Sequence, residues 1–258
     1  KMDEIVQKFL RSTGPVLCVD IGSGTQDALL ARPGLECENW PRFVLPAPAR
    51  LVAQRIRELT LLKRNIWLYG GNMGGGFTQA LKEHLAAGLA VSATPAATRG
   101  IHDNEEVVRG IGVEICAVCP EGSVPVFLTD YSPEFWGGLL RHAGLPLPHL
   151  VLAAAQDHGF HAHGNRQARM RAWTDLLATS SDPARWIYET PPPALTRLVP
   201  LREKTGGPVA DTGASALLGA LCDPEVMDRS YKQGITIINV GNGHTVAALV
   251  YRGQVRGI

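Results

Sequence analysis

The sequence has little of what marks membrane, nucleic-acid-binding or disulfide-stabilised proteins. No apolar run approaches the ~18 residues that a transmembrane helix requires. The 25 Lys and Arg residues nearly balance 24 Asp and Glu residues, and a net charge of +1 provides no basic field for nucleic acid. Five cysteines are an odd number, which argues against a disulfide framework. The first ten residues lack the apolar core of a signal peptide. We therefore expect a cytoplasmic protein that binds neither membrane nor nucleic acid.

The composition is that of a globular chain in which strands and helices alternate. Hydrophobic residues make up 45% and charged residues 19% of the 258 residues, enough to bury a substantial core. Apolar patterns predict strands at residues 16–20, 28–31, 66–69, 89–93, 107–113, 124–129 and 151–155, helices at 49–62, 77–87, 133–142, 166–179 and 214–221, and irregular structure over 180–208. This alternation indicates an α/β fold. We expect two related halves, at residues 1–147 and 148–258.

One short device occurs twice, near the start and near the end of the chain. An apolar, β-branched run ends in Asp20 in the first copy and in Asn239 in the second, and each run leads into a Gly-x-Gly turn. The pattern is typical of strand, tight turn, strand. The turn residues are Gly22, Ser23, Gly24 and Thr25 in the first copy and Gly241, Asn242, Gly243, His244 and Thr245 in the second. Consecutive N–H groups in such turns form concave anion sites, so the pair predicts a polyphosphate held from two sides.

Asp20 is the predicted metal ligand. Mg²⁺ prefers few carboxylates together with phosphate oxygens and retained waters, while the hydroxyls of Ser23 and Thr25 could meet the phosphates. The alternative is an ordinary hairpin whose polar side chains make only turn hydrogen bonds. Asn239 can hydrogen-bond phosphate or water but supplies no charge to a metal, and His244 is by default a solvated loop residue.

Asp211 stands before a small-residue helix, where it is either the N-cap or a general base aimed into a cleft. A helix N-terminus lowers the pKa of a nearby carboxylate. We therefore expect a lowered pKa for Asp211, which suits a residue that orients a nucleophile.

Three further motifs carry candidate chemistry. The glycine-rich run 70–76 follows a predicted strand and precedes a helix, so it either contacts an anionic ligand or allows a close crossing of two domains. Asp157, His158, His161 and His163 lie within seven residues and combine donors that bind Zn²⁺ or Fe²⁺. Asp157 and His158 directly follow an apolar strand, where α/β proteins place ligands, and they are the preferred cleft residues. Cys116 and Cys119 end a β-type run, which favours burial over redox or zinc chemistry.

The motif from Asp20 to Thr25 resembles the first phosphate motif of the actin, Hsp70 and sugar kinase superfamily. The helix led by Asp211 and the hairpin at 239–245 resemble the catalytic-base helix and second phosphate motif of FGGY-type carbohydrate kinases. The middle of the chain, with its runs at 70–76, 96–104 and 156–159, is similar to an uncharacterised prokaryotic family. Its members are often labelled "putative pyruvate formate-lyase activating enzyme". They are predicted to have the actin-like ATPase (ribonuclease H-like) fold, with two halves around a central cleft.

The resemblance implies a protein that binds ATP and Mg²⁺ and hydrolyses ATP, or transfers its phosphoryl group to an unknown small-molecule or protein acceptor, as the halves close. Asp20 would hold the metal, the two turns the phosphates, and Asp211 the nucleophile. Two departures support an alternative, a non-catalytic binding protein with a degenerate second phosphate motif. Asn239 replaces the usual acidic residue, and the superfamily's adenosine-binding glycines lie further along than Ile258, so either the second half is incomplete or the nucleotide site is. A third hypothesis is a metal-dependent enzyme built on Asp157, His158, His161 and His163.

Overall fold

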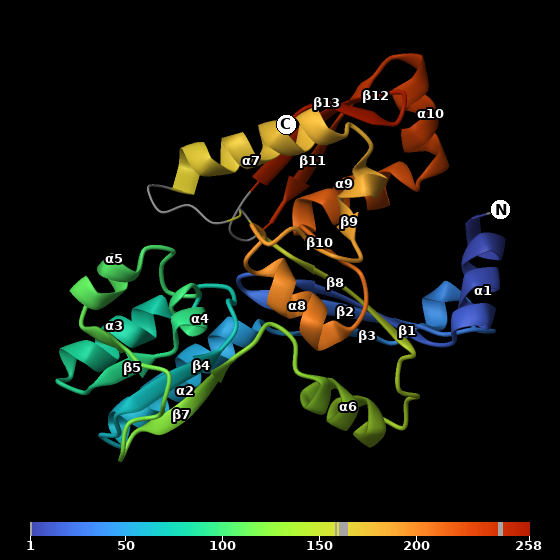
Figure 1. The fold of residues 1–258 in the computed structure, drawn as a ribbon. Helices are drawn as coiled ribbons and strands as arrows, with labels where there is room; N and C mark the ends of the chain where they lie inside the picture. Colours follow the sequence, from blue (N-terminus) through green and yellow to red (C-terminus); the bar gives the residue numbers. More distant parts are fainter. Residues whose placement is uncertain (1, 158, 160–164, 242–244) are drawn as a thin grey trace.

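The computed structural model describes residues 2–157, 159, 165–241 and 245–258, and its strands form three sheets (Figure 1). The strands are β1 (Val16–Ile21), β2 (Thr25–Ala31), β3 (Arg42–Pro46), β4 (Ile66–Gly70), β5 (Val91–Ala93), β6 (Val113–Ile115), β7 (Val124–Leu128), β8 (Leu150–Ala155), β9 (Ile187–Tyr188), β10 (Val209–Ala210), β11 (Ile235–Val240), β12 (Thr245–Tyr251) and β13 (Gln254–Gly257). The helices are α1 (Met2–Thr13), α2 (Pro48–Leu61), α3 (Thr78–Ala86), α4 (Pro95–Thr98), α5 (Glu105–Gly110), α6 (Pro133–His142), α7 (Asn165–Thr179), α8 (Leu198–Thr205), α9 (Thr212–Leu221) and α10 (Pro224–Lys232). Two short 3-10 helices, η1 (Cys37–Asn39) and η2 (Pro183–Trp186), complete the elements. The architecture is α/β, as the alternating pattern predicted.

The first sheet has the strand order β3-β2-β1-β8-β10-β9. β1 and β2 form the predicted hairpin, while β8 runs parallel to β1 and β10 parallel to β8. Inward-facing apolar side chains such as Leu17, Val19 and Leu30 pack with Trp136 of α6 and Leu198 of α8. Because β1, β8 and β10 are parallel, their carboxyl ends meet at one edge of the sheet.

The second sheet has the order β6-β5-β4-β7, and all its strands are parallel. Ile66, Leu68 and Val126 belong to a core that includes side chains of α2, α3, α4 and α5. The chain moves from β4 to β5 and β6 on one side, and β7 then adds to the other side of β4. Such a reversal in strand order opens a crevice at the carboxyl ends of the two strands that flank it, here β4 and β7.

The third sheet is the antiparallel meander β11-β12-β13. Its strand directions repeat those of β1-β2-β3, which places the two glycine turns at equivalent positions in two related hairpins. One face packs on α9 and α10, with Leu217 and Val250 buried between them. In Figure 1 this sheet and its helices lie above the first sheet, and the second sheet lies to one side.

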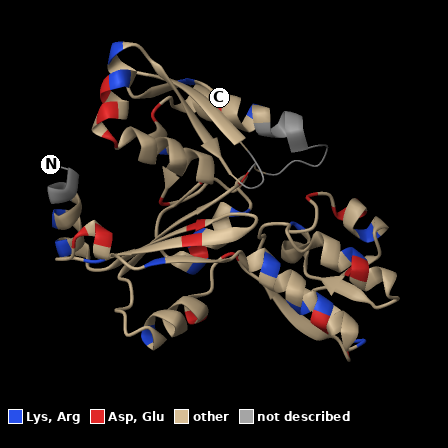
Figure 2. Cartoon of the chain, turned by 180° about the vertical axis from the view of Figure 1, so that it is seen from behind, with Lys and Arg blue, Asp and Glu red and all other residues tan. Residues whose placement is uncertain are grey.

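Several elements differ from the sequence-based expectation. Residues 107–113 are mostly α5 and only then β6, and the stretch 180–208 contains α8 as well as η2 and β9. The first sheet contains strands from both expected halves, because β8 pairs with β1 and β10 with β8, and the division between residues 147 and 148 stays a prediction. None of the described helices is long and apolar enough to cross a membrane. Acidic and basic residues are interspersed along the helices, in keeping with the small net charge (Figure 2).

Candidate functional site

A cleft of about 710 Å³ lies where the three sheets approach one another. Its walls come from loops at the carboxyl ends of β1, β8 and β10 in the first sheet and of β4, β5 and β7 in the second, together with the β11–β12 turn. Carboxyl ends of parallel strands are the usual ligand-binding edge of α/β sheets. The cleft is therefore the candidate functional site.

Both glycine turns reach this cleft. Gly22, Ser23 and Thr25 line it from the β1–β2 turn, which is closed by a 2.9 Å hydrogen bond from the N–H of Gly22 to the carbonyl of Thr25. Asn239 and Gly241 line it from the second turn. The other turn residues are placed differently: the Gly24 carbonyl accepts from Ala47, Thr245 begins β12, and Asn242, Gly243 and His244 lie outside the described residues.

Asp20 lies in the wall of the cleft. Its Oδ1 accepts a 2.8 Å hydrogen bond from the hydroxyl of Thr212, at the start of α9. Asp27 is directly opposite Asp20 in the β1–β2 register and also lines the cleft. Burial raises the pKa of Asp20, the hydrogen bond from Thr212 acts in the opposite direction, and the charge of Asp27 adds to the rise. Two like charges on neighbouring strands repel, so this pair gains from a bound cation.

Asp157 follows β8 and is held by backbone donors on three sides. Its Oδ2 accepts from the N–H groups of Arg197 and Leu198, both at 2.9 Å, and its Oδ1 accepts from Gly159 at 2.8 Å. Burial raises the pKa of Asp157, although these hydrogen bonds favour the carboxylate. Asp157 lines the cleft, as expected from its place after a central strand. His158, His161 and His163 lie outside the described residues.

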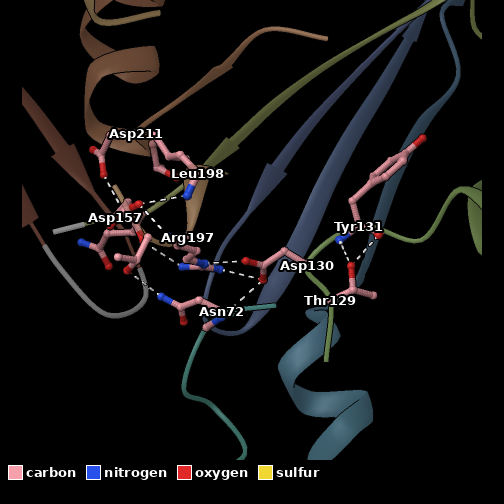
Figure 3. Close-up of polar contacts among 12 residues, drawn as sticks. Asn72, Thr129, Asp130, Tyr131, Asp157, Arg197, Leu198 and Asp211 are labelled. Carbon is pink, nitrogen blue, oxygen red and sulfur yellow. Dashed lines mark hydrogen bonds and ion pairs between the residues drawn. The ribbon is translucent and has the colours of Figure 1, made fainter. Parts of the chain in front are cut away.

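Asp211 is the N-cap of α9, one of the two roles predicted for it. Its Oδ1 accepts from the N–H of Gly213 at 2.8 Å, and its Oδ2 accepts from the N–H of Asp157 at 2.9 Å (Figure 3). It is not one of the described residues that line the cleft. The expected lowering of its pKa is wrong, because burial outweighs these hydrogen bonds and raises the pKa of Asp211 to about 6.

Arg197 connects the two parallel-strand edges and was not anticipated from the sequence. Its guanidinium forms a two-pronged ion pair with Asp130, which follows β7, at 2.6 and 2.9 Å. Its third nitrogen donates to the carbonyl of Gln156, which follows β8, at 2.9 Å. Figure 3 shows Arg197 between Asp130 and Asp157. In the sequence, Asp130 is a single acidic residue after a predicted strand, and Arg197 lies in a segment expected to be irregular. Neither feature distinguishes a buried ion pair from surface charges.

The glycine run 70–76 makes a close crossing, which is one of the two roles considered for it. A Cβ on Gly71 would lie 2.7 Å from Cβ of Pro200, and one on Gly74 would lie 2.9 Å from the guanidinium of Arg197. The loop therefore crosses the start of α8 at a distance that only glycine allows. Gly74, Gly75 and Gly76 also line the cleft.

Cysteine chemistry receives little support from the part of the chain that is described. All five cysteines are free, and Cys119 is partly buried with its thiol directed at the carbonyls of Pro120 and Ser123. No group of three or more His, Cys, Asp or Glu side chains among the described residues is arranged to hold a metal ion. A transition-metal centre therefore finds no complete ligand set among them.

Comparison with known proteins places the chain in a family. No curated protein gives a significant match. A family model described as "Putative pyruvate format-lyase activating enzyme (DUF1786)" matches residues 73–258. Since this match spans well over half of the 258 residues, the chain belongs to that family.

Proposed function

We propose that the protein binds ATP with Mg²⁺ in the cleft and either hydrolyses it or transfers its terminal phosphoryl group to an acceptor. The observation that carries this proposal is the meeting of two related glycine turns in one cleft, although they lie far apart in the sequence. Turns of this kind present N–H groups to anions. The resemblance to actin-like ATPases implies that a bound triphosphate lies between two such turns, one from each of two related hairpins.

The donor set in the cleft suits magnesium. Asp20 and Asp27 offer hard carboxylate oxygens, and the hydroxyls of Thr25 and Thr212 lie in hydrogen-bonding contact with them. Mg²⁺ binds few carboxylates and completes its shell with water and phosphate oxygens. Asp20 and Asp27 would hold the ion, which would offset negative charge during phosphoryl transfer. Without a cation, the acidic wall at Asp20 and Asp27 would repel a triphosphate.

In this proposal Asp157 is the catalytic base and Asp211 is a positioning residue. Asp157 lines the cleft, whereas Asp211 holds the main chain of Asp157 from behind. Asp157 accepts the proton of the attacking water or hydroxyl as the new oxygen–phosphorus bond forms. The bond between the terminal phosphorus and its bridging oxygen breaks, and ADP leaves. The raised pKa of Asp157 makes it a stronger base than a solvated aspartate.

The family description points to a different chemistry that this chain's residues do not fit. A radical-generating activase holds an iron–sulfur cluster on cysteine thiolates. The cysteines of this chain are Cys18, Cys37, Cys116, Cys119 and Cys222, of which only Cys116 and Cys119 are close in sequence. No trio of potential ligands gathers among the described residues. We therefore derive no radical step.

Titration calorimetry with ATP, with and without Mg²⁺, tests the proposal. We expect binding that requires Mg²⁺ and is reduced at least tenfold, or about 1.4 kcal/mol, by Asp20→Asn. The matched control is Asp228→Asn, which alters an exposed carboxylate paired with Lys232 on α10. Unchanged affinity in Asp20→Asn, or binding indifferent to Mg²⁺, would sink the metal assignment. Mg²⁺-dependent binding without any release of phosphate would instead favour the non-catalytic alternative.

A further inference from the structure

Asp20 faces the start of α9 rather than the core beneath the first sheet. Its neighbours in β1, Val19 and Ile21, are buried, and the alternation of side chains along a strand directs Asp20 to the opposite face. There the hydroxyl of Thr212 donates its 2.8 Å hydrogen bond to Oδ1 of Asp20. The two residues are 192 positions apart, so this contact exists only in the folded protein.

Thr212 holds one of the two carboxylate oxygens of Asp20. Its single hydroxyl proton goes to Oδ1, and among the described residues no side chain donates a hydrogen bond to Oδ2. Both residues line the cleft. A hydrogen bond to one oxygen of a ligating carboxylate fixes the direction of the other. Oδ2 is therefore the oxygen of Asp20 that is left for a cation.

The start of α9 is fixed by contacts that do not involve the hydroxyl of Thr212. The carboxylate of Asp211 accepts from the N–H groups of Gly213 and Asp157. A Cβ on Gly213 would lie 3.2 Å from the indole ring of Trp173, so the first turn of the helix also packs closely against α7. The hydroxyl is thus presented from a rigid support, and its removal need not displace the helix.

Two adjacent residues of this helix start hold the two acids of the proposed reaction. Thr212 binds the side chain of Asp20, and Asp211 binds the main chain of Asp157. The distance between the proposed metal ligand and the proposed base is therefore set from one place in the fold. Disturbing the first contact alone should affect the metal and leave the second contact in place.

We propose that Thr212 is a positioning residue for the cation of the cleft. Its hydroxyl orients the carboxylate of Asp20 before the cation arrives. Without this hydroxyl the side chain must lose its rotational freedom as the metal binds, and affinity falls. This assignment rests on the proposed function, which makes Asp20 a metal ligand.

The test titrates Mn²⁺ into the whole chain without nucleotide and follows the free ion by electron paramagnetic resonance. Mn²⁺ has the charge of Mg²⁺ and prefers the same oxygen ligands. We expect binding that is lost in Asp20→Asn. Thr212→Val, which keeps the shape of the side chain but not its hydroxyl, should raise the dissociation constant by about 10–100-fold. Thr212→Ser, which keeps the hydroxyl, should stay within about threefold of the wild type.

The matched control is Thr174→Val. It removes an exposed hydroxyl on α7 that bonds only to the carbonyl of Met170, and it should bind Mn²⁺ as the wild type does. Thermal midpoints check that every variant is folded. The Mg²⁺ concentration that gives half-maximal ATP binding should rise in Thr212→Val by the same factor as the Mn²⁺ dissociation constant. A loss of stability alone would not shift that concentration.

The outcomes separate this inference from the proposed function. Equal Mn²⁺ binding by Thr212→Val and the wild type would overturn the inference, as would a loss in Thr212→Ser as large as that in Thr212→Val. A wild type without Asp20-dependent Mn²⁺ binding would overturn it too. If Mn²⁺ binds as expected but ATP does not, only the proposed function fails. If ATP binding requires Mg²⁺ and Asp20 but is indifferent to Thr212→Val, only the inference fails.

Discussion

The main-chain N–H of Asp157 donates a 2.9 Å hydrogen bond to Oδ2 of Asp211, so the carboxylate that caps α9 also fixes the loop after β8. Asp157 in turn caps the start of α8 through the N–H groups of Arg197 and Leu198. Two carboxylates thus hold two helix starts and one strand end in a fixed relation. This geometry explains why a residue with no place in the wall of the cleft can still control what happens there.

The relation between these two acids predicts unequal losses of turnover. Asp157→Asn should lower kcat for phosphate release by ~10²–10⁴, the scale of a lost general base. Asp211→Asn should lower it by only about 10–100-fold, the scale of a lost orienting contact. Both variants should keep Mg-ATP affinity within a few fold, and thermal midpoints check that both remain folded. A larger loss in Asp211→Asn than in Asp157→Asn would return the base role to Asp211.

The raised pKa of Asp211 predicts how folding stability depends on pH. The native carboxyl titrates at about 6 and its ordinary pKa is 3.8, so between these values the native state holds a proton that the unfolded state has lost. The contribution of Asp211 to the free energy of unfolding is therefore greatest at low pH and declines as pH rises through about 4 to 6. Between low and neutral pH, this contribution to the free energy of unfolding changes by at most about 3 kcal/mol.

Urea denaturation of the wild type and of Asp211→Asn, from pH 4 to pH 7, measures this contribution. The difference in stability, wild type minus variant, should fall as pH rises, because Asn cannot titrate. Asp20, whose pKa is raised too, changes both proteins alike and cancels in the difference, whereas the charge of Asp157 contributes to the raised pKa of Asp211 and so forms part of what the difference measures. A difference that is flat over this range, or that grows with pH, would contradict the raised pKa.

The sequence predicted the local hairpin and much of the surrounding α/β pattern. β1, β2, β8 and the helices α2, α3 and α6 follow from apolar periodicity and from capping or turn residues, which act over a few neighbouring positions. The segment 107–113 was mistaken for a strand, because Val107 and Val108 suggest β structure while Asn104 caps a short helix there. The N-cap at Asn104, three residues before Val107, outweighed the β propensity of the valines.

The site was predictable where it depends on single turns and not where it depends on packing. Asp20 and the first turn could be identified because a strand followed by Gly-x-Gly is a local pattern. The ion pair of Arg197 with Asp130 joins residues 67 positions apart, and no local sequence pattern at either residue predicts its partner. The direction of the Asp211 pKa shift was missed for the same reason, since burial is set by tertiary contacts rather than by a helix terminus.

The ion pair of Arg197 with Asp130 should be costly to break. Asp130 is 5% exposed, so Arg197→Met would leave a buried carboxylate without its partner. We expect a loss of about 3–5 kcal/mol in the free energy of unfolding. Arg229→Met, which breaks an exposed pair with Glu225, should cost less than about 1 kcal/mol.

Adding Asp130→Leu to Arg197→Met should recover much of the lost stability, because the unpaired buried charge is then removed. Guanidinium denaturation of the three variants and the wild type gives these free energies. If Arg197→Met loses no more free energy of unfolding than Arg229→Met, water must solvate Asp130 in the variant. In that case the ion pair does not hold the second sheet against α8.

The crossing of the glycine loop over α8 predicts opposite effects for two glycine-to-alanine changes. In Gly71→Ala the new methyl group would lie 2.7 Å from Cβ and 3.2 Å from Cγ of Pro200. The proline ring cannot rotate away, so the loop and α8 must separate, at a cost of about 1–3 kcal/mol. Gly138→Ala, in the interior of α6, meets nothing within 4 Å and should stabilise by about 0.5–1 kcal/mol, because alanine favours the helix. Thermal unfolding of the two variants should therefore shift the midpoint in opposite directions.

Because the loop also lines the cleft, Gly71→Ala should weaken Mg-ATP binding while Gly138→Ala leaves it unchanged. A Gly71→Ala protein with the stability and the affinity of the wild type would show that the second sheet does not depend on this close contact for its position at the cleft.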